Sequence, residues 1–493
     1  MNLTRKGARS MLGRVPRVSV ITAAAALLVA TAGCEDVLDI PDPENATGDQ
    51  VAQNIDLLVN RTYSDFQVGY SGGGLDDKVL SVTGVFTDEF MSAGTFTTRT
   101  RSDQRLQFSI SQGNTSDGAY GDLHDARVAA VNAADAIAEQ QGQNQLWAEM
   151  KALEGYALVA LAENFCGAVP LSTSTPEAPG EEGQPLSTSE LFTEAIGKFD
   201  QALGAASGGS QIAYLAMVGK ARAQLGLGNV SAAGSTVADV PQDFVYFIEH
   251  SSNSGTQENP MFNLQQNGRY SVANGEGNDT DVGQVADPGG NGIAFHHLDG
   301  DPANEAGDPR LPWVEDPAGG FDASIPLFLN LRYTSLDADV VLADGIEAQL
   351  IRAEADIMAE NYGAAEDQLN DLRGDVQALM SARYPDPTAN DYGFSNVNGA
   401  GETLPDLTLP TNQADAVDVL FKERAFWLFN TGHRLGDMRR LVRAPYSRAP
   451  SDVFPTGSYF KGGSYGPDVA FPVSFGETNN PNFSVDMCDV TQP

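Results

Sequence analysis

The chain has 493 residues and is strongly acidic, with 29 Lys and Arg against 66 Asp and Glu and a formal net charge of −37. A surface of this sign repels nucleic acid and anionic membrane faces, so nucleic acid is not an expected partner. The length allows one large domain or two to three ordinary ones, with a sizeable core. The acidity identifies no ligand, because it also keeps an exported protein soluble.

The first 33 residues have the pattern of a bacterial lipoprotein signal peptide. Basic residues precede an apolar run over 18–29, and the small residues Thr31-Ala32-Gly33 precede Cys34. The run is too short for a membrane-spanning helix, which needs about 20 apolar residues. We therefore expect cleavage before Cys34, lipidation of Cys34, a lipidated tether over 34–45 and attachment through lipid chains. An ordinary secretory signal followed by an unmodified cysteine is the alternative.

Cys166 and Cys488 are the other two cysteines of the chain. An even pair in an exported protein is compatible with a single disulfide, and two buried free thiols are the alternative. A bond between them would hold the C-terminal tail against the segment Asn164–Gly167.

Helical periodicity is concentrated in two blocks, about 118–229 and 344–443. In the first block it predicts two antiparallel helix pairs, over 123–140, 146–165, 189–203 and 212–227. In the second block it predicts helices over 346–357 and 365–379, and a final helix from about Asp415 through Phe429 that breaks at Gly432 and resumes toward Leu441. Helix pairs of about 34 residues with small residues at close contacts are typical of tetratricopeptide-like stacking. We therefore expect a mainly α fold built on a tetratricopeptide-like helix-pair scaffold.

The segment between the two blocks, about 230–343, is rich in Gly, Asn, Asp and Pro and has no sustained period. A structureless stretch of this length would be abnormal in a compact protein, so we expect an ordered lobe of loops and short strands. The stretches 384–409 and 444–493 are expected to join this lobe, and 64–121 is a further irregular stretch. Since such excursions often carry function, the helices are predicted to support an irregular binding face.

The most specific motif lies near the C-terminus. The segment Phe421–Arg440 reads FKERAFWLFNTGHRLGDMRR, which resembles the ER, EL, G-x-R and DLRR pattern of the SusD/RagB family of outer-membrane nutrient-binding lipoproteins. The family's usual glutamate is absent at Asn430 and Thr431. Further stretches resemble the family in the same order along the chain, namely Cys34–Asp39, Glu154–Leu171, Asp308–Leu311, Leu350–Ala355, Leu369–Arg373, Phe471–Val473 and Asn480–Phe483.

The resemblance implies a SusD-like domain over 46–493 that is not an enzyme. Such a protein is anchored by lipid in the outer membrane, faces the cell exterior, binds an oligosaccharide or peptide, and presents it to a SusC-like TonB-dependent barrel. The charged residues between Glu423 and Arg440 are expected to lock helices together through charge-assisted hydrogen bonds. The alternative function is a lipid-anchored helical-repeat scaffold that binds proteins at the outer membrane without nutrient capture.

A surface hydrolase is a third possibility, and the sequence gives it little support. Gly69-Tyr70-Ser71-Gly72-Gly73 fits the G-x-S-x-G pattern, in which a sharp turn from strand to helix exposes the serine. No β-branched strand precedes this segment. We therefore expect no catalytic residues.

Metal motifs are incomplete as well. His296 and His297 are adjacent and lack the spacing of a helical zinc pair, although either could join a nearby aspartate in a loop site. Asp279-Thr280-Asp281 and Asp299-Gly300-Asp301 resemble fragments of calcium loops without the full ligand spacing. No cofactor is expected, and calcium is left open.

Sugar binding needs flat aromatic faces next to groups that hold hydroxyls. Trp313 is the only tryptophan in a predicted loop, since Trp147 and Trp427 fall on predicted helices. The family resemblance places the ligand surface in this region and in the segment before the first helix pair. The candidate ligand residues are Trp313, Arg310, Tyr270, Asn267, Phe295, Phe96, Arg99 and Arg101. For each residue, a loop-anchoring role is the alternative.

Overall fold

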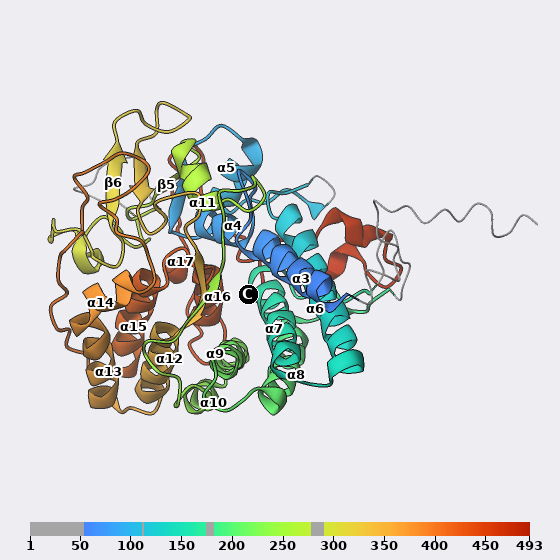
Figure 1. Cartoon of the computed structure of the whole chain (residues 1–493). Coiled ribbons are helices and arrows are strands. Elements are labelled where there is room, and N and C mark those ends of the chain that lie inside the picture. The colour runs from blue at the N-terminus through green and yellow to red at the C-terminus, as the bar shows by residue number, and fades with distance from the viewer. Residues whose placement is uncertain (1–53, 111–112, 174–181, 278–289) are drawn as a thin grey trace, which may run out of the picture. The chain divides into compact units, whose positions relative to one another are not determined.

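A row of helices forms the lower part of the view in Figure 1, and short strands and long loops lie above it. The computed structural model describes residues 54–110, 113–173, 182–277 and 290–493. Residues 54–493 form one unit of the chain. The predicted signal peptide, Cys34 and the predicted tether over 34–45 lie outside the described residues.

Helices make up most of the regular structure, which confirms the prediction of a mainly α fold. The first half contains α3 (Ile55–Tyr70), α4 (Val79–Phe86), α5 (Thr97–Asp103), α6 (Asp117–Gln141), α7 (Gln145–Asn164), α8 (Thr188–Ala205), α9 (Gln211–Gly226), α10 (Val230–Thr236) and α11 (Pro260–Gln266). The second half contains α12 (Gly345–Met358), α13 (Tyr362–Gly374), α14 (Val376–Ser381), α15 (Gln413–Trp427), α16 (Arg434–Val442) and α17 (Pro450–Val453), with short 3₁₀ turns η2 (Leu298–Gly300), η3 (Phe475–Asn479) and η4 (Val485–Met487). No helix in the described ranges is both long and apolar enough to cross a membrane.

The helix pairs α6–α7, α8–α9 and α12–α13 pack as the periodicity predicts. Small residues allow the close approach, because a Cβ atom on Gly155 or Gly219 would lie 2.8 or 2.4 Å from the ring of Phe199. The predicted start of α8 is also confirmed. The Ser187 hydroxyl accepts from the Glu190 amide, and the Glu190 carboxylate accepts from the Ser187 amide at 2.8 Å, which forms a capping box.

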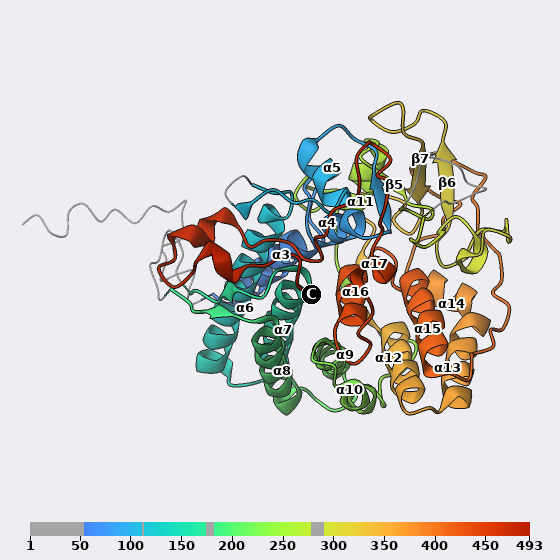
Figure 2. The same ribbon diagram turned by 180° about the vertical axis from the view of Figure 1, so that it is seen from behind.

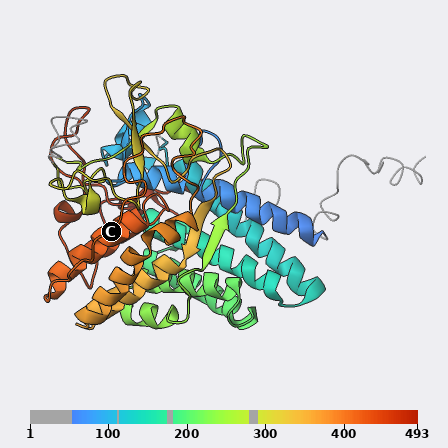
Figure 3. The ribbon, with the colours of Figure 1, turned by 60° about the vertical axis from the view of Figure 1, so that its left-hand side comes forward.

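The stretch 64–121, which its composition predicts to be irregular, contains α4, α5 and the end of α3. All residues of α4 are buried, so no polar face marks its period in the sequence. Helix α3 packs along α6 (Figure 3), where a Cβ on Gly69 would come within 2.8 Å of the Asp122 carbonyl oxygen. The predicted helix over 365–379 is divided at Asp375 into α13 and α14.

The strands are short and form antiparallel pairs within the described residues. The pairs are β1 (Phe90–Ser92) with β5 (Tyr270–Val272), β2 (Val169–Pro170) with β3 (Pro185–Leu186), β4 (Val245–Ile248) with β8 (Val340–Asp344), and β6 (Trp313–Asp316) with β7 (Leu327–Asn330). Most of them fall in the lobe predicted to contain loops and short strands. Figure 2 shows this lobe from behind, with β5, β6, β7, α5 and α11 above the helices.

Charged residues of the C-terminal motif join three helices, as the sequence predicts. The Arg424 guanidinium on α15 donates to Asp437 on α16 at 2.8 and 2.9 Å. Arg440 on α16 donates to Asp437 at 2.8 Å and to Glu354 on α12 at 2.6 Å. All four side chains are nearly inaccessible to solvent. The motif therefore stabilises helix packing, and its charges do not face a ligand.

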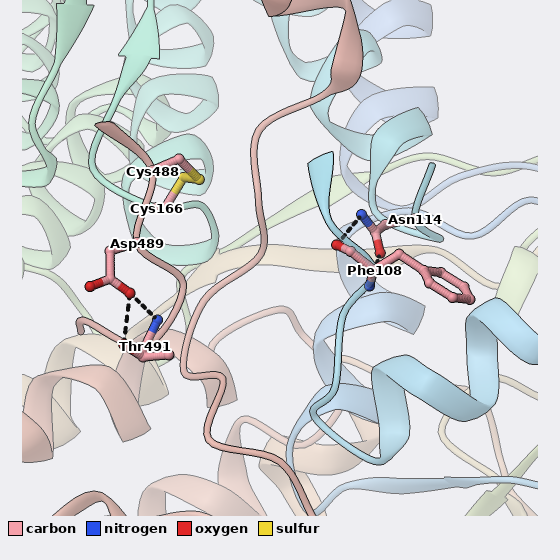
Figure 4. The surroundings of a disulfide bond; sticks show 6 residues. All are labelled: Phe108, Asn114, Cys166, Cys488, Asp489 and Thr491. Atoms are coloured by element: carbon pink, nitrogen blue, oxygen red, sulfur yellow. Dashed lines mark hydrogen bonds between the residues drawn. A yellow bond between two sulfur atoms is a disulfide. The ribbon is translucent and has the colours of Figure 1, made fainter. Parts of the chain in front are cut away.

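Cys166 and Cys488 form a disulfide, with their Cα atoms 5.3 Å apart (Figure 4). The bond joins the end of α7 to the C-terminal tail, next to Asp489. Backbone hydrogen bonds hold the same region, since the Cys166 amide donates to the Phe471 carbonyl at 2.8 Å. Of the two alternatives that the sequence leaves open, the structure contains the disulfide.

Replacing both cysteines with alanine (C166A/C488A) should lower the free energy of unfolding by about 2–5 kcal/mol, because the bond closes a long loop in the unfolded chain. Chemical denaturation of both proteins under oxidising conditions measures the difference. A reducing agent should bring the wild type to the value of the variant. A difference below about 0.5 kcal/mol would contradict a stabilising role for the bond.

Candidate ligand-binding site

Two of the predicted ligand residues lie in the core. The Arg310 side chain has 0% exposure and donates to Asp308 and Glu423, both at 2.7 Å. Phe295 is equally buried, with its ring centroid 5.2 Å from that of Phe426. Their surroundings are those of loop anchors, the alternative role left open by the sequence. Neither side chain faces a surface that a ligand could reach.

Two further aromatic candidates are buried in the strand pairs. Trp313 lies on β6 rather than in a loop, is 7% exposed, and stacks on His296 with ring centroids 4.6 Å apart. Tyr270 lies on β5, has 0% exposure, and its hydroxyl donates to Asp77 at 2.6 Å. The sequence gives no sign of this burial, since it depends on strand pairing between distant segments. Strand pairing therefore buries Trp313 and Tyr270, which lie in a region predicted to consist of loops and short strands.

The arginines of α5 are largely engaged within the protein. The Arg99 side chain is nearly buried and donates from Nε to the Asp77 carboxylate at 2.7 Å. Arg101 is half-buried, and its guanidinium carbon lies 4.2 Å from the centroid of the Phe108 ring. Both side chains support the loop around α5.

The remaining candidates, Phe96 and Asn267, are exposed and lie near two residues that the sequence does not single out. Phe96 is 52% exposed and Phe321 is 56% exposed. The Arg269 guanidinium lies between them, with its carbon 5.1 Å from the Phe96 centroid and 3.8 Å from the Phe321 centroid. We call Phe96, Asn267, Arg269 and Phe321 the aromatic patch.

Three segments that are far apart in the sequence build the aromatic patch. Phe96 is the N-cap residue of α5, Arg269 precedes β5, and Phe321 lies in the loop between β6 and β7. Helices α5 and α11, which flank the first two segments, lie side by side at the top of Figures 1 and 2. Asn267 follows the last residue of α11, and its side-chain amide nitrogen donates to the Asn263 carbonyl at 2.8 Å. This leaves the side-chain oxygen of Asn267 exposed.

Backbone hydrogen bonds fix these segments to one another. The Ala93 amide donates to the Arg269 carbonyl at 2.9 Å, and the Phe321 amide donates to the Gly268 carbonyl at 2.8 Å. Gly268 has φ +63°, and a Cβ there would lie 2.6 Å from the Phe321 nitrogen. Only glycine fits this close approach. The turn at Gly268 therefore holds the Phe321 segment beside Arg269, and the Ala93–Arg269 hydrogen bond ties in the segment that precedes Phe96.

A separate concave surface of about 750 Å³ lies between α3, α7 and β4. Tyr63, Glu149 and Tyr246 line it, and the Tyr246 hydroxyl donates to the Glu149 carboxylate at 2.7 Å. Burial raises the pKa of Glu149, although hydrogen bonds from the tyrosines oppose the shift. The Glu149 carboxylate and the Tyr246 hydroxyl are already hydrogen-bonded to each other. The cavity therefore offers a ligand fewer free polar groups than its residue types suggest.

Ser71, the serine of the G-x-S-x-G segment, is hydrogen-bonded to His250. Ser71 caps the C-terminus of α3, and its hydroxyl lies 2.9 Å from Nε2 of His250, whose Nδ1 lies 3.0 Å from the Gln257 carbonyl. Ser71 has 0% exposure, and burial lowers the pKa of His250 to about 4. The contact lies at the buried C-terminal end of α3. A substrate could reach the Ser71 hydroxyl only if the end of the helix unfolded.

The residues of the conceivable loop metal site are engaged elsewhere. His296 is buried, with Nε2 3.2 Å from the Val272 carbonyl, and burial lowers its pKa to about 3. Asp299 pairs with Arg310 and Arg373, each at 2.9 Å. Over the described ranges no group of three or more His, Cys, Asp and Glu side chains could hold a metal ion. The other calcium-loop fragment, 279–281, lies outside the described residues.

Neither a protein-family model nor a curated protein sequence matches the chain. Solved structures do match. A SusD superfamily protein from Bacteroides thetaiotaomicron aligns with a TM-score of 0.55 at 14% identity, over 88% of this chain and 99% of the other. The chain has a SusD-like fold. This agreement confirms the fold that the C-terminal motif implies.

Two other solved structures with this fold are described by what they bind. The surface glycan-binding protein A from Bacteroides uniformis aligns with a TM-score of 0.54 at 12% identity, over 89% of this chain and 99% of that one. A SusD-like carbohydrate-binding protein from Bacteroides vulgatus aligns with a TM-score of 0.52 at 17% identity, over 79% and 83%. At these identities the SusD-like fold is shared, and the side chains of any binding site must be argued from this chain itself.

Proposed function

We propose that this SusD-like chain is a surface lipoprotein that binds a nutrient oligosaccharide at the aromatic patch and delivers it to a SusC-like TonB-dependent barrel in the outer membrane. The observation that carries the proposal is the patch, in which two Phe rings more than half exposed flank a polar turn. The fold and the glycan-binding neighbours support it. The proposed role is binding without catalysis.

The chemistry of the patch suits a sugar ring. The apolar CH face of a pyranose complements an aromatic face, and amide or guanidinium groups at the ring edge hold its hydroxyls. Phe96 and Phe321 provide the aromatic faces, while Asn267 and Arg269 provide the polar groups. Because the patch is open to solvent, it can hold internal units of a long chain as well as its ends.

The proposed location rests on Cys34. Lipidation of this residue would anchor the protein by acyl chains at the outer membrane, facing the cell exterior. A lipid anchor places a binding protein beside a barrel without a transmembrane helix. Metabolic labelling with an alkyne fatty acid should mark the wild type, and C34A should remove the label and release the protein from the membrane fraction.

The variant F96A/F321A should lose at least tenfold in affinity for an oligosaccharide, because removing two exposed stacking faces costs more than the 1.4 kcal/mol that corresponds to a factor of ten. A glycan microarray identifies a bound oligosaccharide, and isothermal titration calorimetry then compares the two proteins. Exposed side chains contribute little to the core, so the melting temperature should stay unchanged.

Phe475 provides a matched control for this test. It is 50% exposed and lies in η3 of the C-terminal segment, where Glu477 accepts a hydrogen bond from Tyr120 of α6 at 2.9 Å. The variant F475A should bind as the wild type does. Equal losses in F475A and F96A/F321A, or selective binding of peptides instead of glycans, would contradict the proposed site.

Delivery to a partner requires a complex, which can be isolated directly. The tagged, lipidated protein is purified from detergent-solubilised outer membranes, and co-purifying proteins are identified by mass spectrometry. The proposal predicts a barrel of the TonB-dependent class. Recovery of soluble proteins alone would favour the helical-repeat scaffold instead.

A further inference from the structure

We propose that the aromatic patch selects oligosaccharides that carry an anionic group, a carboxylate or a sulfate, and that Arg269 is the residue that recognises it. This inference rests on the proposed function, since it names the ligand class of the same site. It concerns the specificity of the patch and can fail while oligosaccharide binding at the patch holds.

The first observation is that Arg269 has no internal partner. Its side chain makes no hydrogen bond or ion pair with any described residue, and its Nη1 atom is buried without a hydrogen-bond partner. Arg310 and Arg424 pair with carboxylates. Other buried arginines without a carboxylate partner donate to backbone carbonyls, as Arg105 does to Asp468 at 2.9 Å and Arg439 to Ala162 at 3.0 Å. Arg269 has neither kind of partner among the described residues.

The second observation is the way Arg269 is held. The rings of Phe96 and Phe321 lie close to its guanidinium, and cation–π contacts of this kind favour that position of the side chain. The alkyl part of Arg269 packs near Gly94, with Cδ 3.7 Å from the position of a Cβ on that glycine. The side chain is therefore ordered before any ligand binds, and less entropy is lost when an anion pairs with it.

The neighbouring charges leave Arg269 uncompensated. The Arg99 cation and the Asp77 carboxylate both act on Arg269 electrostatically, with opposite signs, and Asp77 already pairs with Arg99 at 2.7 Å. On the other side, Lys461 donates to the Gly94 carbonyl, and its charge acts on the half-buried Asp322 as well as on the buried Asp103. Asp77 and Asp322 therefore each have another cation nearby, and neither forms an ion pair with Arg269.

A planar guanidinium recognises carboxylates and sulfates through two parallel hydrogen bonds. A uronic acid residue whose ring contacts Phe321 would bring its carboxylate to Arg269, and a sulfate ester on a neutral sugar presents the same acceptor geometry. An anion bound at the patch would pair with this half-buried guanidinium. Local attraction at this point would overcome the repulsion that an acidic protein exerts on an anionic ligand.

The test uses pairs of probes that share their sugar rings and differ in the anionic substituent. Tetragalacturonate and its fully methyl-esterified form have the same sugar rings, and a κ-carrageenan tetrasaccharide with its desulfated counterpart gives the sulfate comparison. We expect the wild type to bind one anionic probe at least tenfold tighter than its neutral counterpart, with a preference that decreases as salt rises. Preference for the carboxylate or for the sulfate distinguishes the two sources of the anion.

Two variants assign the preference to Arg269. R269Q should bind the charged and neutral probes equally, and R269K should keep part of the preference without the paired hydrogen bonds. R61Q, which changes an exposed arginine on α3, is the matched control and should behave as the wild type. The melting temperature of each variant checks folding, and the wild-type comparison stands if a variant fails to fold.

The outcomes separate the inference from the proposed function. If the wild type binds each charged probe and its neutral counterpart equally, or if R269Q keeps the preference, the inference about anions is wrong, while sensitivity to F96A/F321A would still support the patch. If the anionic preference is present but F96A/F321A leaves all binding unchanged, the ligand binds elsewhere and both proposals fail.

Discussion

Replacing Arg310 with methionine should lower the free energy of unfolding by about 3–5 kcal/mol, the typical cost of removing one partner from a buried ion pair. Arg310 pairs with Asp308, Asp299 and Glu423, and its own side chain is inaccessible to solvent. Methionine fills a similar volume but leaves the buried Asp308 carboxylate without a cation, whereas Asp299 and Glu423 keep Arg373. Urea denaturation followed by circular dichroism measures the loss.

An exposed ion pair gives the control. Arg448 donates to Asp418 at 2.8 Å on the surface, so R448M should change stability by less than 1 kcal/mol. The contrast between the two variants tests whether Arg310 is structural. If R310M and R448M have similar stability, the network around Glu423 does not stabilise the fold as argued.

The stability of the protein should fall as pH rises from about 4.5 to about 8, with Glu89 as a main contributor. Glu89 has 0% exposure, and burial raises its pKa to about 8, although a hydrogen bond from the Asn430 amide opposes the shift. The folded protein keeps this carboxyl protonated over a range in which the unfolded chain ionises it. Its contribution is therefore fully present below about pH 4.5 and is lost as pH passes through about 8.

The variant E89Q should flatten this dependence, because glutamine cannot ionise. A rise in the pKa of Glu89 from its ordinary value of 4.5 to about 8 corresponds to at most roughly 5 kcal/mol. Denaturation at pH 5, 6.5 and 8 gives the slope for the wild type, E89Q and the exposed control E305Q. Asp103, whose pKa burial raises to about 7, acts in the same direction and should leave a residual slope in E89Q. An unchanged slope in E89Q would show that Glu89 is ionised in the folded state.

Local patterns in the sequence predict much of the helical scaffold. The capping box at Ser187 and Glu190 and the apolar rows of α12 and α13 act over a few residues, so they are visible without a structure. The motif between Glu423 and Arg440 implies its ion pairs for a similar reason, since charges buried in a helix need partners. The completely buried α4 has no such pattern and was not predicted.

The candidate site is predicted less well, because it depends on contacts between distant segments. Trp313 and Tyr270 have the residue types of a sugar-binding surface, but strand pairing buries them. Phe321 follows two glycines in a loop that has no period, and its exposure results from the β6–β7 hairpin. Unpaired Arg269 could be found only once the partners of the other arginines were known.

The location of the patch follows from the division of the fold. The helices and their buried ion pairs form a rigid support, whereas α5, the turn at Gly268 and the β6–β7 loop meet on the lobe above it. Three separately anchored segments can vary their surface residues without changing the helical core.

A crystal structure of the protein with its tightest-binding oligosaccharide is the most direct test of ligand binding at the aromatic patch. The sugar rings should lie against Phe96 and Phe321, with a polar or anionic substituent at Arg269. Density for the oligosaccharide in the cavity lined by Tyr63, Glu149 and Tyr246, with the patch free of ligand, would contradict it.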